Sequence, residues 1–289
     1  MPDHVTARVP ATSANLGSGF DSLGLALGLS ADITISLGPL EGAKEHPLIV
    51  TAFRAAYEAA GRAPPSEVSI AISGGFPVAR GLGASAAFRA AGVIAANTMM
   101  GEPLSSDDLL AIGAALETHA DNMAPALFGG LQIVVHDGET WHRLAVPLAA
   151  GLKIVLLVPD FEMPTNKSRR KLPQHLPRED AVYNLGRAAL LVAALAQGRW
   201  DLLDAATHDR LHQPARAEIF PAMVNVMAAA KDGGAHAAYL SGAGSTIAAL
   251  ATHDEERIAR LMQQAAVARG YSAHTIITEP AAEGARVVS

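Results

Sequence analysis

The chain of 289 residues contains no cysteine. This absence excludes a disulfide scaffold, a zinc site built on thiolates, an iron–sulfur cluster and a cysteine nucleophile. Long apolar runs are missing too, because stretches such as Ala188–Ala196 are far shorter than the roughly 18 residues that a membrane-spanning helix needs. Met1–Pro10 lacks the basic start and apolar segment of a signal peptide. We therefore expect a soluble, cytoplasmic protein without a membrane partner.

The sequence also has no surplus of basic residues. Its 28 acidic side chains outnumber 22 lysines and arginines, which gives a formal charge of −6. A nucleic-acid-binding protein usually carries a basic excess, so no nucleic-acid partner is expected. The composition is that of a globular protein, with 50% apolar and 17% charged residues, and the chain is long enough for one large or two modest domains.

Short β-rich runs alternate with longer helical patterns, which predicts a mixed α and β architecture. Strands are expected at residues 5–9, 31–37, 68–72 and 153–159. The turn signal Asp137-Gly138 lies between Leu131–His136 and Trp141–Val146, so these two segments are expected to form a hairpin. A new series of strands and helices begins after Ala149-Ala150-Gly151. This pattern predicts two domains, at residues 1–150 and 151–289.

Helices are predicted where start and stop signals agree. Ser106 is expected to cap a helix that runs to about His119, with two aspartates in its first turn. The segment Thr252-His253-Asp254-Glu255 has the pattern of a capping box, and Gly270 is expected to close the helix that follows. Two further helices are expected at residues 181–197 and 221–233.

A glycine-rich segment leads directly into helix-forming residues: Pro77-Val78-Ala79-Arg80-Gly81-Leu82-Gly83-Ala84-Ser85-Ala86-Ala87. Free backbone N–H groups and the positive end of the helix dipole at such a junction favour a bound phosphate, although an ordinary turn would have the same pattern. The lack of a lysine excludes a Walker loop. Gly74-Gly75-Phe76-Pro77 separates the nominal dinucleotide pattern Gly81-x-Gly83-x-x-Ala86 from the preceding strand. The order of elements best fits a loop whose amides hold ATP phosphates while Ser85 reaches a magnesium ion.

Three other polar segments are candidate parts of a site. Ser241-Gly242-Ala243-Gly244-Ser245-Thr246 is either a loop that closes over a phosphate or a tight turn between core elements. Glu117-Thr118-His119-Ala120-Asp121-Asn122 suits a magnesium ligand and substrate hydrogen bonds, or is simply a polar helix end. His208-x-x-x-His212 would place two imidazoles on one helix face, but a third zinc ligand is not evident. The sequence has no Gly-x-Ser-x-Gly elbow, which disfavours a Ser-His-Asp hydrolase.

Several of these segments resemble the motifs of one family. Pro10-Ala11-Thr12-Ser13-Ala14-Asn15-Leu16-Gly17-Ser18-Gly19-Phe20-Asp21 resembles the N-terminal motif of homoserine kinases, within the GHMP small-molecule kinase superfamily. Residues 77–87 and 241–246 are similar to that superfamily's second and third motifs. His119-Ala120-Asp121-Asn122 with Ala124-Pro125-Ala126 is similar to a stretch more particular to homoserine kinases. The resemblance covers almost the whole chain and extends to Glu283-Gly284-Ala285-Arg286-Val287-Val288.

The resemblance implies a two-domain α+β GHMP kinase fold, with an N-terminal ribosomal-protein-S5-like domain, a C-terminal ferredoxin-like domain and assembly as a homodimer. It implies transfer of the γ-phosphoryl group of MgATP to the hydroxyl of L-homoserine, a step toward threonine. Carried over by matching positions, Ser85 and Glu117 would bind Mg²⁺, while residues 77–87, Gly242 and Gly244 would bind ATP. The implied substrate-binding residues are Asn15, Asp21, His119, Asn122, Thr165, Arg169 and Arg216. Their chemistry agrees, because a carboxylate suits an ammonium group and a guanidinium fork suits a carboxylate.

The implied catalytic residues are Ser85, Glu117 and Asn122. Asn122 stands where relatives such as mevalonate kinase have a catalytic aspartate, and an amide cannot take a proton at neutral pH. The resemblance therefore implies a reaction without an enzyme base, in which Asp121 is structural, although Asp121 could also be proposed as the base. Two positions depart from the common pattern, since Ala84 replaces a serine and Ser245 a proline. The alternatives are a GHMP kinase with another acceptor, a non-catalytic metabolite sensor and a nicotinamide-binding oxidoreductase.

Overall fold

The computed structural model describes residues 2–289 and contains two antiparallel sheets. The first sheet is built from β1 (His4–Ala14), β2 (Leu23–Ser36), β3 (Ser69–Gly74), β4 (Leu131–His136), β5 (Trp141–Val146) and β10 (Arg286–Val287). Its strand order is β10-β1-β2-β4-β5, and β3 also pairs with β2. β1 pairs along one edge of β2, and two strands share the other edge: Leu23–Leu25 pairs with β4 and Ala31–Ser36 pairs with β3.

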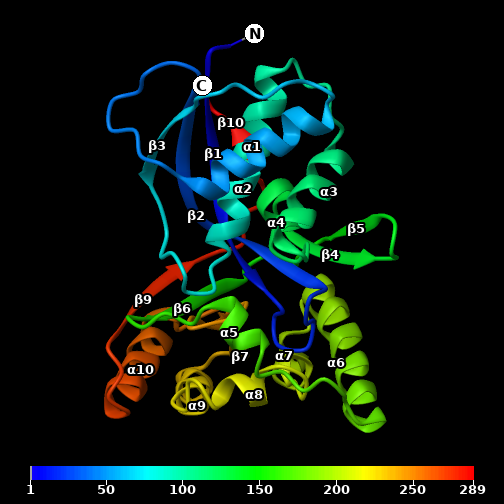
Figure 1. Ribbon diagram of the computed structural model, residues 1–289. Coiled ribbons are helices and arrows are strands. Elements are labelled where there is room, and N and C mark those ends of the chain that lie inside the picture. The colour runs from blue at the N-terminus through cyan, green and yellow to red at the C-terminus, as the bar shows by residue number, and fades with distance from the viewer. Residues whose placement is uncertain (1) are drawn as a thin grey trace.

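The β1–β2 ribbon changes the face that it buries half-way along. Val5, Val9 and Ile33 pack into the core of the first domain. The register then shifts between Pro10 and Ala11, and Ala11 packs toward the second sheet. An irregularity of this kind turns a strand's side chains to the other face. One ribbon therefore belongs to both cores, and Figure 1 shows it extending from the upper half of the molecule into the lower half.

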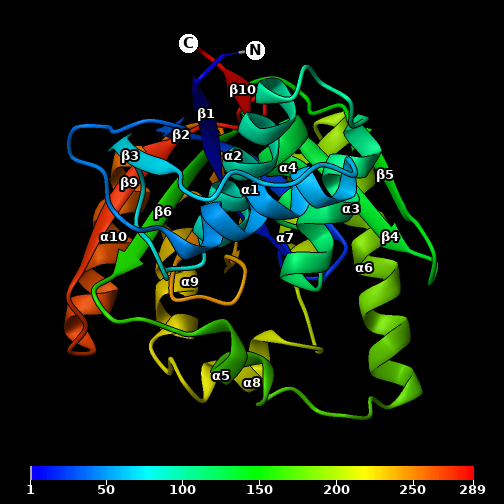
Figure 2. The same cartoon turned by 45° about the horizontal axis from the view of Figure 1, so that its top comes forward.

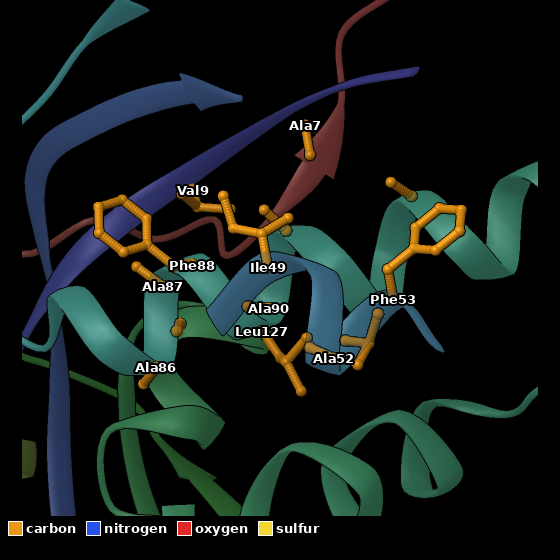
Figure 3. Close-up of a cluster of buried hydrophobic side chains, with 14 of the residues drawn as sticks. Ala7, Val9, Ile49, Ala52, Phe53, Ala86, Ala87, Phe88, Ala90 and Leu127 are labelled. Carbon is orange, nitrogen blue, oxygen red and sulfur yellow. The ribbon is translucent and has the colours of Figure 1, made fainter. Parts of the chain in front are cut away.

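Four helices cover one face of the first sheet: α1 (Pro47–Ala59), α2 (Ala84–Met99), α3 (Ser106–Glu117) and α4 (Met123–Phe128). The side chains between α1, α2 and β1 are mostly small, as Ala52, Ala87 and Ala90 show in Figure 3. Small side chains let the two helices lie close together. A Cβ added at Gly92 on α2 would stand 2.5 Å from the carbonyl oxygen of Ile49 on α1.

The second sheet contains β6 (Lys153–Pro159), β7 (Ala237–Leu240), β8 (Ile247–Ala251) and β9 (Ala273–Thr278), in the order β7-β8-β6-β9. Between β6 and β7 lie α5 (Thr165–Arg169), α6 (Arg178–Gln197), the short 3₁₀ helix η1 (Trp200–Leu202), α7 (Leu203–Thr207), α8 (Gln213–Ala217) and α9 (Met223–Gly233), and α10 (Glu255–Ala268) precedes β9. This chain order and sheet order are those of a ferredoxin-like domain, which confirms the expectation for the C-terminal half. α9 and α10 pack on one face of the sheet, and the β1–β2 ribbon and α6 pack on the other.

The last residues of the chain return to the first sheet. β10 pairs with β1, and the N–H of Thr6 donates to the carbonyl of Ser289 at 2.7 Å. The N-terminal strand β1 and the last residues of the chain therefore lie side by side, as Figure 2 also shows. Strands β1–β5 of the first sheet precede residue 150, and strands β6–β9 of the second sheet follow it. β10 also follows residue 150 but belongs to the first sheet. The domain boundaries at residue 150 stay a prediction. Among residues 2–289, no helix combines the length and apolar character that crossing a bilayer requires.

Four predicted helix starts are wrong in detail. The capping box of α3 is formed by Ser105 and not Ser106, because the Ser105 hydroxyl accepts from the N–H of Asp108 at 3.2 Å. The predicted box at residues 252–255 is absent from the described structure, since Thr252 contacts His236 instead and Asp254 precedes α10 with a left-handed backbone. The helix predicted from residue 221 begins at 223, and the one predicted from 181 begins at 178.

We predict opposite effects of the same substitution at two helical glycines. Gly92→Ala should lower the free energy of unfolding by about 1–3 kcal/mol, because the added methyl overpacks the contact between α1 and α2. Gly186 lies exposed on α6, and among residues 2–289 no atom apart from its own helix lies within 4 Å of an added Cβ. Gly186→Ala should therefore raise stability by about 0.5–1 kcal/mol. Urea denaturation of the two variants measures both effects, and equal stabilities would contradict this account of the α1–α2 contact.

Candidate active site

A cavity of about 560 Å³ lies between the two domains. Its lining includes most of the predicted site residues: Asn15, Asp21, Val78, Ala79, Gly81, Leu82, Gly83, Ala84, Ser85, Ala86, Glu117, His119, Asn122, Thr165, Arg169, Arg216 and Gly242. Pro77, Arg80, Ala87 and Gly244 lie outside this lining. Residues predicted from four separate motifs therefore surround one space.

The glycines of the second motif are required by close approaches and by backbone conformation. Gly83 has a φ of 66° directly before α2, and a Cβ there would stand 1.7 Å from Thr12 Oγ1. Gly81 has a φ of 77°, and a Cβ there would stand 2.3 Å from the carbonyl oxygen of Ser241. No side chain of residues 2–289 caps the start of α2, so the N–H groups of its first turn remain available to an anion.

The first, second and third motifs are hydrogen-bonded to one another. The buried Ser241 hydroxyl donates to the carbonyl of Gly81 at 2.7 Å and lies 2.8 Å from the hydroxyl of Ser13. Arg80 is not part of the cavity lining, and its Nε and Nη2 donate to the carbonyls of Pro159 and Asp160 at 3.0 and 2.9 Å. Arg80 therefore fastens the glycine loop to the end of β6, a role that the motif alone did not indicate.

The two predicted metal ligands are in direct contact. The Ser85 hydroxyl donates to Glu117 Oε1, and the guanidinium of Arg89 contacts the same oxygen. Arg89 also donates to Ser85 Oγ at 2.7 Å. Only 10% of the Glu117 side chain and 15% of the Arg89 side chain are exposed, and burial lowers the pKa of Arg89. Sequence reasoning missed Arg89, although its position four residues after Ser85 on one helix was a usable signal.

A carboxylate beside a hydroxyl fits magnesium, which usually takes one or two protein carboxylates together with substrate phosphates and water. Among residues 2–289, no group of three or more His, Cys, Asp and Glu side chains could hold a metal ion. The protein alone therefore offers an incomplete coordination shell. Phosphate oxygens at the start of α2 would complete it.

Asp21 and Arg169, which also line the cavity, form a bidentate ion pair across the domains, with distances of 2.7 and 2.8 Å. The hydrogen bond to Asp21 raises the pKa of Arg169. Arg216 is fully buried, and its Nη1 donates to Gly242 O at 3.0 Å and to His212 Nδ1 at 2.8 Å. Burial, followed by repulsion from Arg169, lowers the pKa of Arg216 to about 10, so the guanidinium remains charged at neutral pH.

The expectation that His208 and His212 lie on one helix face is wrong, and zinc was already disfavoured there. His208 follows α7 with half of its side chain exposed, whereas His212 is completely buried before α8 begins. Because Nδ1 of His212 accepts from Arg216, its Nε2–H donates to Gly17 O at 2.7 Å. Burial lowers the pKa of His212 to about 4, which keeps the ring neutral. His212 thus orients Arg216 without adding a second positive charge.

The polar segment Glu117–Asn122 is held together by the buried carboxylate of Asp121. Its Oδ1 accepts from the N–H of Asn122 at 2.9 Å and lies 3.0 Å from His119 Nδ1. The Oδ1 of Asn122 accepts from the Thr12 hydroxyl at 2.7 Å. Burial lowers the pKa of His119, but the close contact with the Asp121 carboxylate and its negative charge outweigh it, and the net pKa is raised above 6.5.

The arrangement has counterparts in known proteins. The family model for the GHMP kinases N terminal domain matches residues 47–130, and the model for the GHMP kinases C terminal matches residues 191–268. A homoserine kinase of Deinococcus radiodurans is 43% identical over 265 residues, which cover 86% of this chain and 84% of that protein. A homoserine kinase of Thermus thermophilus is 40% identical, covering 93% of this chain and 94% of that one. The chain belongs to the homoserine kinase family of the GHMP kinases.

Solved structures agree with this membership. The chain superimposes on a homoserine kinase from Cytophaga hutchinsonii with a TM-score of 0.89 and 27% identity, covering 100% of this chain and 98% of that one. A mevalonate kinase shares the fold alone, with a TM-score of 0.68 at 12% identity. The expectation of a two-domain α+β GHMP kinase fold is confirmed.

We predict that His119 titrates above pH 6.5 and that Asp121→Asn lowers its midpoint, which histidine NMR on both proteins would measure. Because the folded pKa is raised, the pairing stabilises the fold fully below the unfolded pKa of about 6.5 and loses this contribution as pH rises through the folded pKa. The stability difference between the wild type and Asp121→Asn should therefore shrink from pH 5.5 to pH 9. Equal NMR midpoints in the two proteins would show that Asp121 does not control His119.

Proposed function

We propose that this chain transfers the γ-phosphoryl group of ATP to the hydroxyl of L-homoserine, giving O-phospho-L-homoserine and ADP. The observation that carries the proposal is the pairing of two features in one cavity. The glycine loop and the uncapped start of α2 suit phosphates, while Asp21, Arg169 and Arg216 suit an amino-acid zwitterion. The 43% identical relative named homoserine kinase supports the same reaction.

The ion pair of Asp21 and Arg169 favours an acceptor that carries both charges. A zwitterion can replace each partner of this ion pair. Its ammonium group would contact Asp21, and its carboxylate would contact Arg169 near Arg216. Each charged group then keeps a partner. A neutral alcohol, in contrast, would separate the pair and leave two partly buried charges without compensation, which is costly.

Positioning and charge compensation account for the chemistry that we propose. Ser85 and Glu117 would hold Mg²⁺, which would neutralise charge on the phosphates during transfer. The amides of residues 81–85 would orient the phosphates. Asn122 would orient the acceptor without taking its proton, which passes to the transferred phosphoryl group. The Asp121 carboxylate already accepts from the N–H of Asn122 and contacts the His119 ring. These contacts support a structural role for Asp121 and a reaction without an enzyme base.

Other expectations from the sequence and the family resemblance remain predictions. These are a place in threonine biosynthesis, a cytoplasmic location, homodimeric assembly, and the absence of nucleic-acid and membrane partners. Ala84 is the feature that motivates the metabolite-sensor alternative, so turnover has to be measured directly.

The reaction is tested by ADP release from MgATP with L-homoserine, D-homoserine, L-serine, L-threonine and mevalonate offered in parallel. We expect strong turnover with L-homoserine alone, because the other acceptors differ in stereochemistry, in the position of the hydroxyl or in lacking the ammonium group. Turnover with a different acceptor would retain the kinase assignment but discard the substrate. ATP binding without any turnover would favour the sensor.

The substrate contact is tested by Arg169→Ala, with Arg170→Ala as the matched control because Arg170 directly follows α5 and is exposed. Loss of a charged partner should lower kcat/KM for L-homoserine by about 30-fold, corresponding to roughly 2 kcal/mol. The KM for ATP should not change, because the glycine loop is untouched. A similar loss in both variants would contradict a specific contact with the substrate carboxylate.

A further inference from the structure

Arg89 is a charged residue of the cavity to which neither the sequence motifs nor the proposed reaction gives a role. It lies one helical turn after Ser85 and lines the cavity together with residues 81–86. Its guanidinium contacts Ser85 and Glu117, and its buried Nε has no hydrogen-bond partner among residues 2–289. Arg89 thus has unused donor capacity at the end of the cavity that suits phosphates.

The contacts of Arg89 coincide with those that the magnesium ion would need. Glu117 Oε1 accepts from Ser85 and also contacts Arg89, so one oxygen serves both groups. An ion bound by Ser85 and Glu117 would withdraw this oxygen from the guanidinium. Arg89 and the ion therefore compete for the same carboxylate.

Displacement from Glu117 would leave Arg89 as a mostly buried cation near the positive end of the α2 dipole. An unpaired charge in such a place is unfavourable, and a nearby anion would relieve it. The anion that the neighbouring amides of α2 suit is a phosphate group. A guanidinium can contact two phosphate oxygens at once, which makes arginine well suited to this exchange.

We propose that Arg89 is a nucleotide-binding residue that exchanges Glu117 for the phosphates of ATP when Mg²⁺ takes the carboxylate. This inference rests on the proposed function for the identity of the nucleotide but not for the identity of the acceptor. It has two consequences. Arg89 strengthens the binding of MgATP, and it weakens the binding of a divalent ion to the nucleotide-free protein.

The first consequence is tested by calorimetric titration of MgATP into the full chain, without an acceptor. Arg89→Met keeps an unbranched side chain but removes the charge, and we expect it to raise the Kd for MgATP by about tenfold to a hundredfold. Arg89→Lys keeps the charge but not the fork, so its Kd should fall between those of Arg89→Met and the wild type. Arg54→Met, on the exposed surface of α1, is the matched control and should bind like the wild type.

The second consequence is tested with Mn²⁺ as the probe ion, by following free Mn²⁺ in the electron paramagnetic resonance spectrum of the nucleotide-free chain. Removing the competing guanidinium should tighten Mn²⁺ binding by about threefold or more in Arg89→Met. A residue that merely positions Glu117 would give the opposite result, with weaker Mn²⁺ binding after its removal. Circular dichroism establishes that each variant is folded, and if Arg89→Met is not folded, Arg89→Lys decides by its Kd for MgATP.

Unchanged MgATP binding in the folded variants would overturn the proposal, and so would weakened Mn²⁺ binding in Arg89→Met. Neither readout uses L-homoserine. If MgATP binding depends on Arg89 but L-homoserine is not turned over, this inference therefore stands and the proposed reaction fails. If L-homoserine is turned over but the Kd for MgATP does not depend on Arg89, the proposed reaction stands and this inference fails.

Discussion

The cavity depends on one buried junction at which three distant parts of the chain are hydrogen-bonded. Ser241 lies at its centre, with a hydroxyl that reaches Ser13 at the end of β1 and Gly81 in the glycine loop. These residues are separated by up to 228 positions in the sequence. A buried hydroxyl with both of its bonds satisfied fixes position more strictly than apolar packing does, because any displacement leaves a polar group unpaired. The register shift in the β1–β2 ribbon delivers Ser13 to this point by bringing the end of β1 toward the second sheet.

Around this junction, the charged groups of the cavity are arranged in compensated pairs. Asp21 faces Arg169, Glu117 faces Arg89, and Asp121 faces His119. The remaining cation, Arg216, contacts a neutral histidine and a backbone carbonyl. A ligand that enters such a site exchanges partners with groups that are already desolvated, and the exchange is favourable only if it supplies both signs of charge. An amino-acid zwitterion meets this condition at one end, and a metal–nucleotide complex meets it at the other.

The sequence predicted those parts of the site that are encoded locally. The glycine loop, its helix and the segment from Glu117 to Asn122 were found because conformation and chemistry coincide within a few neighbouring residues. Arg80, Arg89 and His212 were missed or misread because their roles depend on groups that only the fold brings near. The fastening of Arg80 to the end of β6 crosses 79 positions, and no local pattern can indicate such a contact. Helix boundaries show the same limit, since the capping pattern at residues 252–255 is present but Thr252 hydrogen-bonds to His236 instead.

At the start of α2, one side-chain hydroxyl is missing, while backbone amides and the nearby Arg89 offer other hydrogen-bond donors. Ala84 stands where the resembled motifs commonly carry a serine, so under the proposed function this chain has one side-chain donor fewer beside the phosphates. The backbone amides at this helix start do not depend on side-chain identity, and Gly81 and Gly83 allow the close approaches to Ser241 and Thr12 that hold the loop in place. Under the exchange proposed for Arg89, a guanidinium one turn further along contributes several donors at the same place. The alanine then marks a redistribution of phosphate contacts along α2, and it does not by itself indicate a loss of catalysis.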